Sequence, residues 1–141
     1  MGMEYNAHTM KQTNSEPKTR NIYKVVRSRV INGKRKLVSA YVIGETLHRV
    51  YRIGLKTLPA EGTKLFGFTN LKEAKKYCEF QNDSHIYIAK ATGVHHNGWL
   101  SYEMKPEAVV IAFETLQMSN PPKDYKSSVV CDSITLVKRI V

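Results

Sequence analysis

Three short stretches of this sequence place cationic side chains next to aromatic rings, a combination suited to nucleotides. An arginine side chain can hold a phosphate through paired hydrogen bonds, an aromatic ring can stack on a nucleobase, and an amide can read the edge of that base. Stacking of this kind contributes roughly 1–3 kcal/mol per base. The candidate ligand-binding residues are Arg49, Arg52, Tyr77, Phe80, Asn82, His85 and Lys90.

Each of these residues also has an ordinary structural explanation. Tyr51, Tyr77 and Tyr87 could be aromatic residues at the edge of a hydrophobic core, and a single arginine on a strand is usually solvated. The nucleotide hypothesis therefore depends on several residues meeting at one place. We expect that place to be near the end of the helix predicted at residues 71–80.

The sequence contains none of the motifs that mark common catalytic, phosphate or metal sites. It has no Gly-x-Ser-x-Gly, no Walker phosphate loop and no Gly-x-Gly-x-x-Gly. His95 and His96 are adjacent and would point to opposite faces of an extended segment, and Cys78 and Cys131 have no nearby partner at zinc spacing. We therefore expect a protein that is not an enzyme and that uses no cofactor or metal ion.

The composition indicates one soluble domain with an anionic partner. Lys and Arg number 22 against 12 Asp and Glu, and the resulting net charge of +10 attracts phosphate in any form. The hydrophobic fraction of 42% is typical of a globular domain with a real core. No apolar run reaches the roughly 18 residues that a membrane helix needs, and no export signal is recognisable. We expect a cytoplasmic protein whose two cysteines are small buried hydrophobes.

Residues 70–80 predict the amphipathic helix around which the fold is organised. Asn70 is a good N-cap, and Glu73 is placed three residues later, where it could complete a capping box. Leu71, Ala74 and Cys78 repeat along one side of this helix, while its lysines lie on the other. We therefore expect this helix to cover one face of a sheet.

Most of the remaining chain predicts strands. The Asn32-Gly33 pair is a strong hairpin signal between strands at 22–31 and 36–43. Further strands are expected at 47–55, 64–68, 85–91 and 127–141, the last of them bent or divided near Asp132. Residues 100–117 fit either a helix or a strand.

These elements predict an α+β fold class. We expect a mainly antiparallel sheet of about five to seven strands with one principal amphipathic helix. Residues 1–20 are polar and are expected to form a flexible basic arm, and residues 21–141 a single α+β domain.

A set of segments spread over most of residues 22–141 is similar to a known family. The segments are 23–26, 39–42, 50–54, 62–80 and 131–136. In these segments and in their order the chain resembles the first family of Thoeris anti-defence proteins, which are phage proteins that sequester cyclic nucleotide signals inside an infected bacterium.

The resemblance implies a homo-oligomer, either a dimer or an assembly of dimers, with ligand pockets at subunit interfaces. It implies intact binding of a cyclic ADP-ribose isomer, and in some relatives of cyclic di- or trinucleotides at a separate site. By local context it implies that Arg52, Phe80 and Asn82 supply the arginine, the stacking ring and the amide of the pocket.

Three other functional classes compete with this sponge hypothesis. The chain could be a nucleic-acid-binding module that uses the basic hairpin tip at 32–36 and the sheet face. It could be a hydrolase or transferase acting on the same class of nucleotide, because catalytic triads are spatial and need not show in sequence. It could also be an inhibitor that binds a host protein.

Overall fold

The computed structural model describes residues 18–40, 49–79, 81–96, 99, 106–116 and 118–141. The strands are β1 (Thr19–Ile31), β2 (Lys34–Ser39), β3 (Val50–Tyr51), β4 (Lys56–Thr57), β5 (Leu65–Phe68), β6 (Ser84–Thr92), β7 (His95–His96), β8 (Ser128–Cys131) and β9 (Ser133–Arg139). The helices are α2 (Leu71–Glu79), α3 (Pro106–Thr115) and the short 3₁₀ helix η2 (Lys123–Tyr125).

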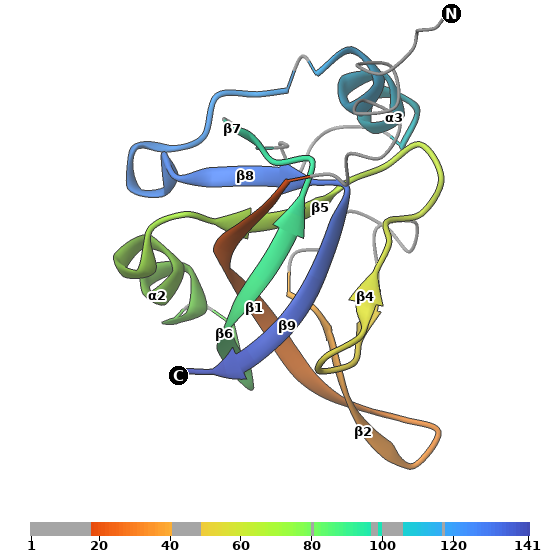
Figure 1. The fold of residues 1–141 in the computed structure, drawn as a ribbon, viewed down its shortest axis with the longest axis vertical. Coiled ribbons are helices and arrows are strands. Elements are labelled where there is room, and N and C mark those ends of the chain that lie inside the picture. The colour runs from red at the N-terminus through yellow and green to blue at the C-terminus, as the bar shows by residue number, and fades with distance from the viewer. Residues whose placement is uncertain (1–17, 41–48, 80, 97–98, 100–105, 117) are drawn as a thin grey trace, which may run out of the picture.

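These strands form one nine-stranded sheet in which every paired neighbour is antiparallel (Figure 1). Seven strands follow the order β4-β9-β6-β1-β5-β8-β7, and β2 and β3 branch from β1. The predicted α+β class, with a mainly antiparallel sheet and a principal amphipathic helix, is confirmed. β1 begins at Thr19, within the segment expected to be an arm, and residues 1–17 lie outside the described part of the chain.

The long strand β1 is the centre of the sheet because it pairs along both edges. One edge pairs with β6 from Thr19 to Arg27, while the other pairs with β2 from Val26 onward and with β5 at Tyr23. The predicted hairpin between β1 and β2 is confirmed. Asn32 and Gly33 both have positive φ angles, of 51° and 76°, as the two-residue turn requires.

The sheet curls back on itself, so that a single residue joins β8 in one half of the sheet to β9 in the other. β8 pairs with β5 and β9 pairs with β6, and only Asp132 separates β8 from β9. The two ends of the order β9-β6-β1-β5-β8 are therefore covalently connected. The bend predicted near Asp132 is confirmed, and the C-terminal segment pairs within the sheet as expected.

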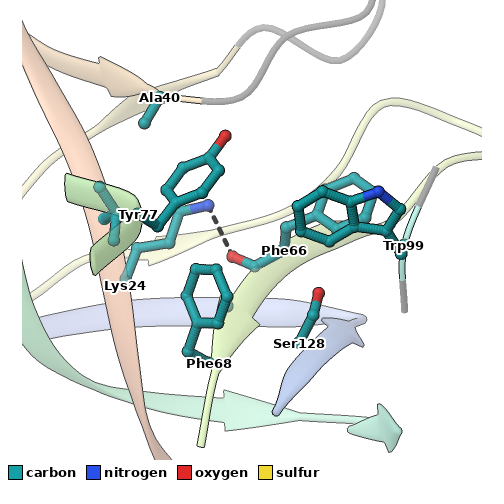
Figure 2. A pocket seen from close by; sticks show the side chains of 9 residues that line it. Lys24, Ala40, Phe66, Phe68, Tyr77, Trp99 and Ser128 are labelled. Atoms are coloured by element: carbon teal, nitrogen blue, oxygen red, sulfur yellow. Dashed lines mark hydrogen bonds between the residues drawn. The ribbon is translucent and has the colours of Figure 1, made fainter. Parts of the chain in front are cut away.

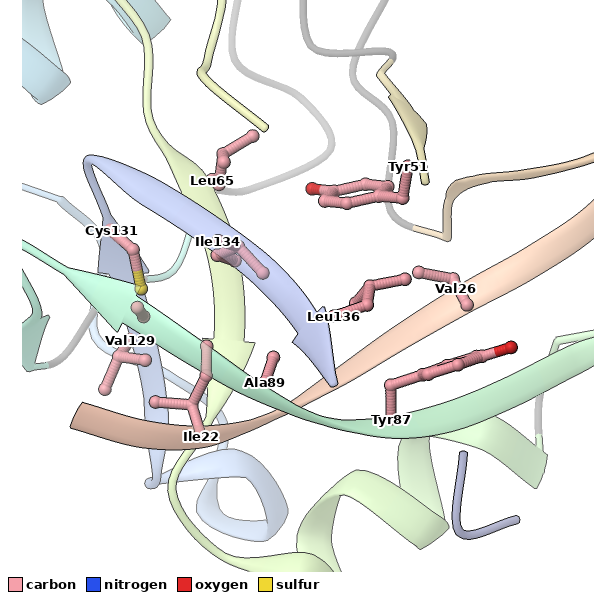
Figure 3. Packing of buried hydrophobic residues seen from close by; sticks show 11 residues of the cluster. Ile22, Val26, Tyr51, Leu65, Tyr87, Ala89, Val129, Cys131, Ile134 and Leu136 are labelled. Carbon is pink, nitrogen blue, oxygen red and sulfur yellow. The ribbon is translucent and has the colours of Figure 1, made fainter. Parts of the chain in front are cut away.

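The concave side of this curl holds the inner cluster, which is the main hydrophobic core (Figure 3). Its buried members are Ile22, Val26, Tyr51, Leu65, Tyr87, Ala89, Ala91, Val129, Cys131, Ile134 and Leu136. Fully burying one of its valine, leucine or isoleucine side chains stabilises the fold by about 1.5–3 kcal/mol. The expectation that Cys131 is a small buried hydrophobe is confirmed, and Cys78 is half-buried on α2.

The outer cluster lies between the sheet and α2 and includes Val25, Phe68, Ala74, Tyr77 and Ile86. Alternation along β1 sends Val25 to this side and Val26 to the inner cluster, as the period of two requires. Ala112 and Phe113 of α3 pack against Val130 in a third, smaller cluster.

The N-terminal end of α2 is only partly as predicted. The backbone N–H of Glu73 donates to Asn70 Oδ1 at 3.0 Å, so the N-cap is confirmed. The prediction that Glu73 completes a capping box is wrong, because the Glu73 carboxylate instead accepts a hydrogen bond from the backbone N–H of Ser127 at 2.7 Å. This contact ties the first turn of α2 to the residue before β8.

Two further segments differ from the sequence prediction or resolve it. Of the strand predicted at 47–55, residues 47–48 lie outside the described part of the chain, and residues 49–55 form a strand only at Val50–Tyr51, because Gly54, with φ +83°, forms a turn in which Leu55 N–H donates to Arg52 O at 3.1 Å. The alternation of Tyr51, Ile53 and Leu55 in the sequence predicts one buried face, but Ile53 and Leu55 are each 57% exposed. The ambiguous segment is a helix over Pro106–Thr115, with proline at its first position. None of the described helices has the length and apolar character needed to cross a bilayer.

Candidate anion-binding site

Arg49 and Arg52 were both predicted from the sequence, and they share one hollow beside β3 and β4. The hollow has a volume of about 480 Å³, within the range of small-molecule pockets. Among the residues that the structure describes, its lining includes three cationic side chains and no carboxylate. We call it the cationic hollow, and its lining residues are Arg49, Val50, Arg52, Leu55, Lys56, Thr57 and Leu58.

The pairing of β3 with β2 fixes the two arginines. Tyr51 lies opposite Leu37 and is buried in the inner cluster, so Val50 and Arg52, on either side of it, point away from the core, whereas Arg49 is two residues from Tyr51. The backbone N–H of Arg49 donates to Ser39 Oγ at 2.9 Å, and Ser39 N–H donates to Arg49 O at 3.0 Å. The Arg49 backbone is therefore anchored on both sides.

Arg49 also carries a donor that the described residues do not satisfy. Its Nε is buried and has no hydrogen-bond partner among the described residues. A buried polar atom without a partner costs roughly 1–3 kcal/mol. Because Nε is itself buried, a solute in the open hollow does not reach this atom, and the case for an anion depends on the positive charges of the lining residues.

The other wall of the hollow comes from β4, which is held by a different part of the sheet. Lys56 and Thr57 pair with Thr135 and Ile134 of β9, and the Gly54 N–H donates to Leu136 O at 2.8 Å. Leu55 and Leu58 are 57% and 60% exposed, so this wall offers apolar surface beside the charge of Lys56. The hollow can thus contact both a charged and an apolar part of one ligand.

The remaining predicted residues do not join the cationic hollow. Tyr77 is buried in the outer cluster, where its ring centroid lies 5.4 Å from that of Phe68 and 5.5 Å from that of Tyr125. Tyr51 and Tyr87 are likewise buried, in the inner cluster. Figure 1 shows α2 and β4 far apart across the molecule, so the expected meeting of Arg52 with the end of α2 is not found.

Asn82, His85 and Lys90 follow α2 in the chain and spread along β6. Asn82 is exposed, and its carbonyl oxygen accepts a hydrogen bond from Arg27 Nε at 3.3 Å. His85 and Lys90 are five residues apart on one strand, which separates them by about 17 Å. Phe80, the predicted stacking residue, lies outside the described residues.

Lys24 is a chemically distinctive residue that the sequence analysis missed. Its side chain is buried in β1, with the residue only 5% exposed, and its Nζ donates to the carbonyl oxygen of Phe66 at 2.6 Å (Figure 2). The ammonium also lies 5.2 Å from the centroid of the Tyr51 ring. Burial lowers the pKa of Lys24 to about 8. Its position between Ile22 and Val26, on the buried side of β1, was the available sequence signal.

The position of Lys24 explains why the fold retains a buried cation. β2 pairs with β1 from Val26 onward, whereas β5 pairs at Tyr23, so Lys24 lies where the two strands diverge. Its ammonium occupies the fork and bonds to β5 there. The adjoining pocket, whose walls include Phe68, Tyr77 and Trp99, leaves only about 20 Å³, enough for about one water.

The thiol beside Lys24 is not a nucleophile. Burial raises the pKa of Cys131 to about 12, against the opposing effect of the Lys24 charge, so the thiol stays protonated near neutral pH. Among the described residues, no three His, Cys, Asp or Glu side chains are grouped so that they could hold a metal ion.

The structure is that of an α+β protein whose open, positively charged hollow is its candidate ligand site. Models of known protein families, curated proteins and solved structures gave no match to this chain.

Proposed function

We propose that this protein is a non-catalytic binder of a small phosphate-bearing nucleotide, and that it sequesters a cyclic nucleotide signal. The observation that carries the proposal is the cationic hollow, in which Arg49, Arg52 and Lys56 line one open cavity of about 480 Å³. The resemblance to the Thoeris anti-defence family makes a cyclic ADP-ribose isomer the first ligand to test, and cyclic oligonucleotides the second.

The chemistry of the hollow suits an anion that is held and not cleaved. Arginine binds phosphate through a planar fork of donors, and lysine adds a point charge. The described part of its lining includes no carboxylate, imidazole or thiol that could act as a general base or nucleophile. The aliphatic side chains of Val50, Leu55 and Leu58 offer a surface for a ribose or base.

The proposal includes self-association as a homo-oligomer. Ile53, Leu55 and Leu58 are large apolar side chains that are more than half exposed close together in sequence, and such groupings often mark interfaces. β3 and β4 are also short edge strands within the described sheet. Light scattering of the purified protein with and without ligand measures the subunit number.

The decisive experiment tests intact capture. Purified protein is incubated with a cyclic ADP-ribose isomer, freed of unbound ligand and heat-denatured, and the released molecules are identified by mass spectrometry. We expect near-stoichiometric recovery of unaltered ligand, and a loss of affinity of about tenfold or more in Arg52→Ala.

Lys72→Ala is the matched control, because it removes one exposed positive charge from α2 and should leave capture unchanged. Recovery of a chemically altered nucleotide would indicate an enzyme. Failure to capture any cyclic nucleotide would overturn the proposal.

A nucleic-acid-binding module is the second candidate, and the β1–β2 hairpin favours it. The hairpin projects beyond the rest of the sheet, and Arg29, Lys34 and Arg35 near its tip are exposed (Figure 1). Binding through phosphate contacts should weaken steeply with salt, at about one decade of affinity per decade of salt for each contact. A gel shift that persists at physiological salt and disappears in Lys34→Ala would favour this function.

A further inference from the structure

Three basic residues from three different strands meet at the base of the β1–β2 hairpin. His85 lies opposite Val26 in the β1–β6 ladder, and Arg139 lies opposite Tyr87 in the β6–β9 ladder. Because His85 and Tyr87 are two residues apart, their side chains share one face of β6, the face of the inner cluster. His85 and Arg139 are therefore diagonal neighbours, with Cα atoms about 7–8 Å apart.

Arg35 reaches the same place from β2. Its Nη1 donates to Ser28 Oγ at 2.9 Å, and Ser28 is two residues from Val26 on the same face of β1. The Ser28 N–H donates to Asp83 O at 2.8 Å, which places Ser28 beside the turn that leads into His85. Arg35 and Arg139 are exposed and His85 is half-buried, so a solute can reach all three.

The charges in this group act on one another. Partial burial and the positive charges of Arg139 and Arg35 lower the pKa of His85, while Asp83 opposes them. The two arginines therefore favour a neutral imidazole at pH 7. An anion placed among these groups would reverse that preference, because it stabilises the imidazolium.

We propose that Arg35, His85 and Arg139 form a second anion site, separate from the cationic hollow, that binds a phosphate group. Arg139 Nε donates to Val141 O at 3.0 Å and Arg35 Nη1 to Ser28 Oγ, so these contacts orient the two guanidinium groups and a phosphate would bind to their other N–H donors. The imidazole adds a third positive charge when it is protonated. Binding is consequently tighter at acidic pH. The proposal does not depend on the proposed function, because it shares no residue with the cationic hollow.

The phosphate could belong to a free nucleotide or to a nucleic-acid backbone, and the experiment distinguishes the two. The full chain is titrated from pH 5 to 8.5 in three samples, one with no addition, one with pyrophosphate and one with an eight-nucleotide single strand. The imidazole signals are followed by NMR, and His85→Gln assigns the signal of interest. His95 and His96 lie on β7 and serve as comparison signals, and His95 is the stricter control because His96 Nε2 lies 3.1 Å from Arg20 Nη1.

Pyrophosphate is expected to raise the pKa of His85, with little change for His95 and His96, and to bind about tenfold more weakly in Arg139→Ala. If Arg139→Ala unfolds, Arg139→Lys is used in its place. This variant keeps the positive charge and should retain most of the rise in the pKa of His85. A shift with the oligonucleotide alone would assign the site to a nucleic-acid backbone. An unchanged His85 titration in both samples would overturn the proposal.

Discussion

The Lys24 ammonium donates a hydrogen bond to the carbonyl oxygen of Phe66 across 2.6 Å, at the fork where β2 and β5 separate from β1. A buried cation without an acidic partner is usually costly, and among the described residues a backbone carbonyl and the Tyr51 ring contact this ammonium. The contact links β1 to β5 beside Tyr23, the one residue at which the backbones of these two strands pair. It makes the stability of the fold depend on the protonation of one side chain.

The free energy of unfolding should therefore rise with pH between about 8 and 10.5 through Lys24. The pKa of this residue falls from 10.5 to about 8 on folding, so the unfolded chain binds more protons in that window. The full difference corresponds to about 3 kcal/mol. We expect the stability of the native chain relative to Lys24→Met to grow from pH 7 to 9.5 in denaturant unfolding.

Lys90→Met is the control for this measurement, because Lys90 is exposed on β6. Its difference from the native chain should stay constant over the same pH range. Cys131 opposes this trend, because its raised pKa lowers stability above about pH 9. Since the Lys24 charge lowers the pKa of Cys131, Lys24→Met also changes that contribution, and the comparison is cleanest below about pH 9. Parallel curves for the native chain and Lys24→Met would contradict the assignment of a lowered pKa.

Lys56 should matter as much as Arg52 for ligand capture. It lines the cationic hollow from β4, together with the two arginines that flank β3, and would supply a charge-assisted contact to an anion. We expect Lys56→Ala to weaken binding of a cyclic ADP-ribose isomer about tenfold in calorimetry. Lys56→Arg should retain most of the affinity, and Lys75→Ala on α2 should have no effect. Equal binding by Lys56→Ala and the native chain would exclude Lys56 from the site.

The Asn70 cap and the Glu73–Ser127 contact should stabilise the fold independently. Asn70→Ala removes the cap and is expected to cost about 1 kcal/mol, and Glu73→Ala leaves the Ser127 N–H without its acceptor at a cost of about 1–3 kcal/mol. The double variant should show the sum of both losses in thermal or denaturant unfolding. A reciprocal capping box would instead couple the two residues. Glu79→Ala, at the far end of α2, should be nearly neutral.

Gly33→Ala should destabilise the β1–β2 hairpin through the backbone alone. Gly33 has a φ of +76°, and a Cβ there would meet nothing within 4 Å, so no side-chain clash contributes. A left-handed conformation costs an L-residue roughly 1–2 kcal/mol. Asn32→Gly at the neighbouring position, with φ +51°, should be neutral within about 0.5 kcal/mol. Unfolding free energies of the two variants measure the contrast.

The elements that follow local rules could be predicted from the sequence. The Asn70 cap begins α2, the Asn32-Gly33 pair turns β1 into β2, and the chain bends at Asp132, because each depends on a few adjacent residues. The burial of Tyr51 beside the exposed Ile53 and Leu55 could not be predicted in the same way. It depends on the turn at Gly54 and on pairing with the distant strands β2 and β9.

The residues of the candidate sites also differ in whether the sequence alone could group them. Arg49 and Arg52 are close in sequence and could be grouped by inspection, whereas Lys56 reaches the hollow only because β4 pairs with β9, about 80 residues away. The buried position of Lys24 could not be predicted without knowing where β2 and β5 diverge from β1. Arg35, His85 and Arg139 meet only after three strands have found their register.

The covalent joint at Asp132 also has a consequence during synthesis of the chain. β1, β5 and β6 leave the ribosome well before β8 and β9, so the aliphatic side chains meant for the concave side stay wetted until residues 128–139 have emerged. A chaperone that shields nascent apolar strands would act in that interval. Ribosomes stalled before and after residue 139 should therefore carry nascent chains of sharply different protease resistance.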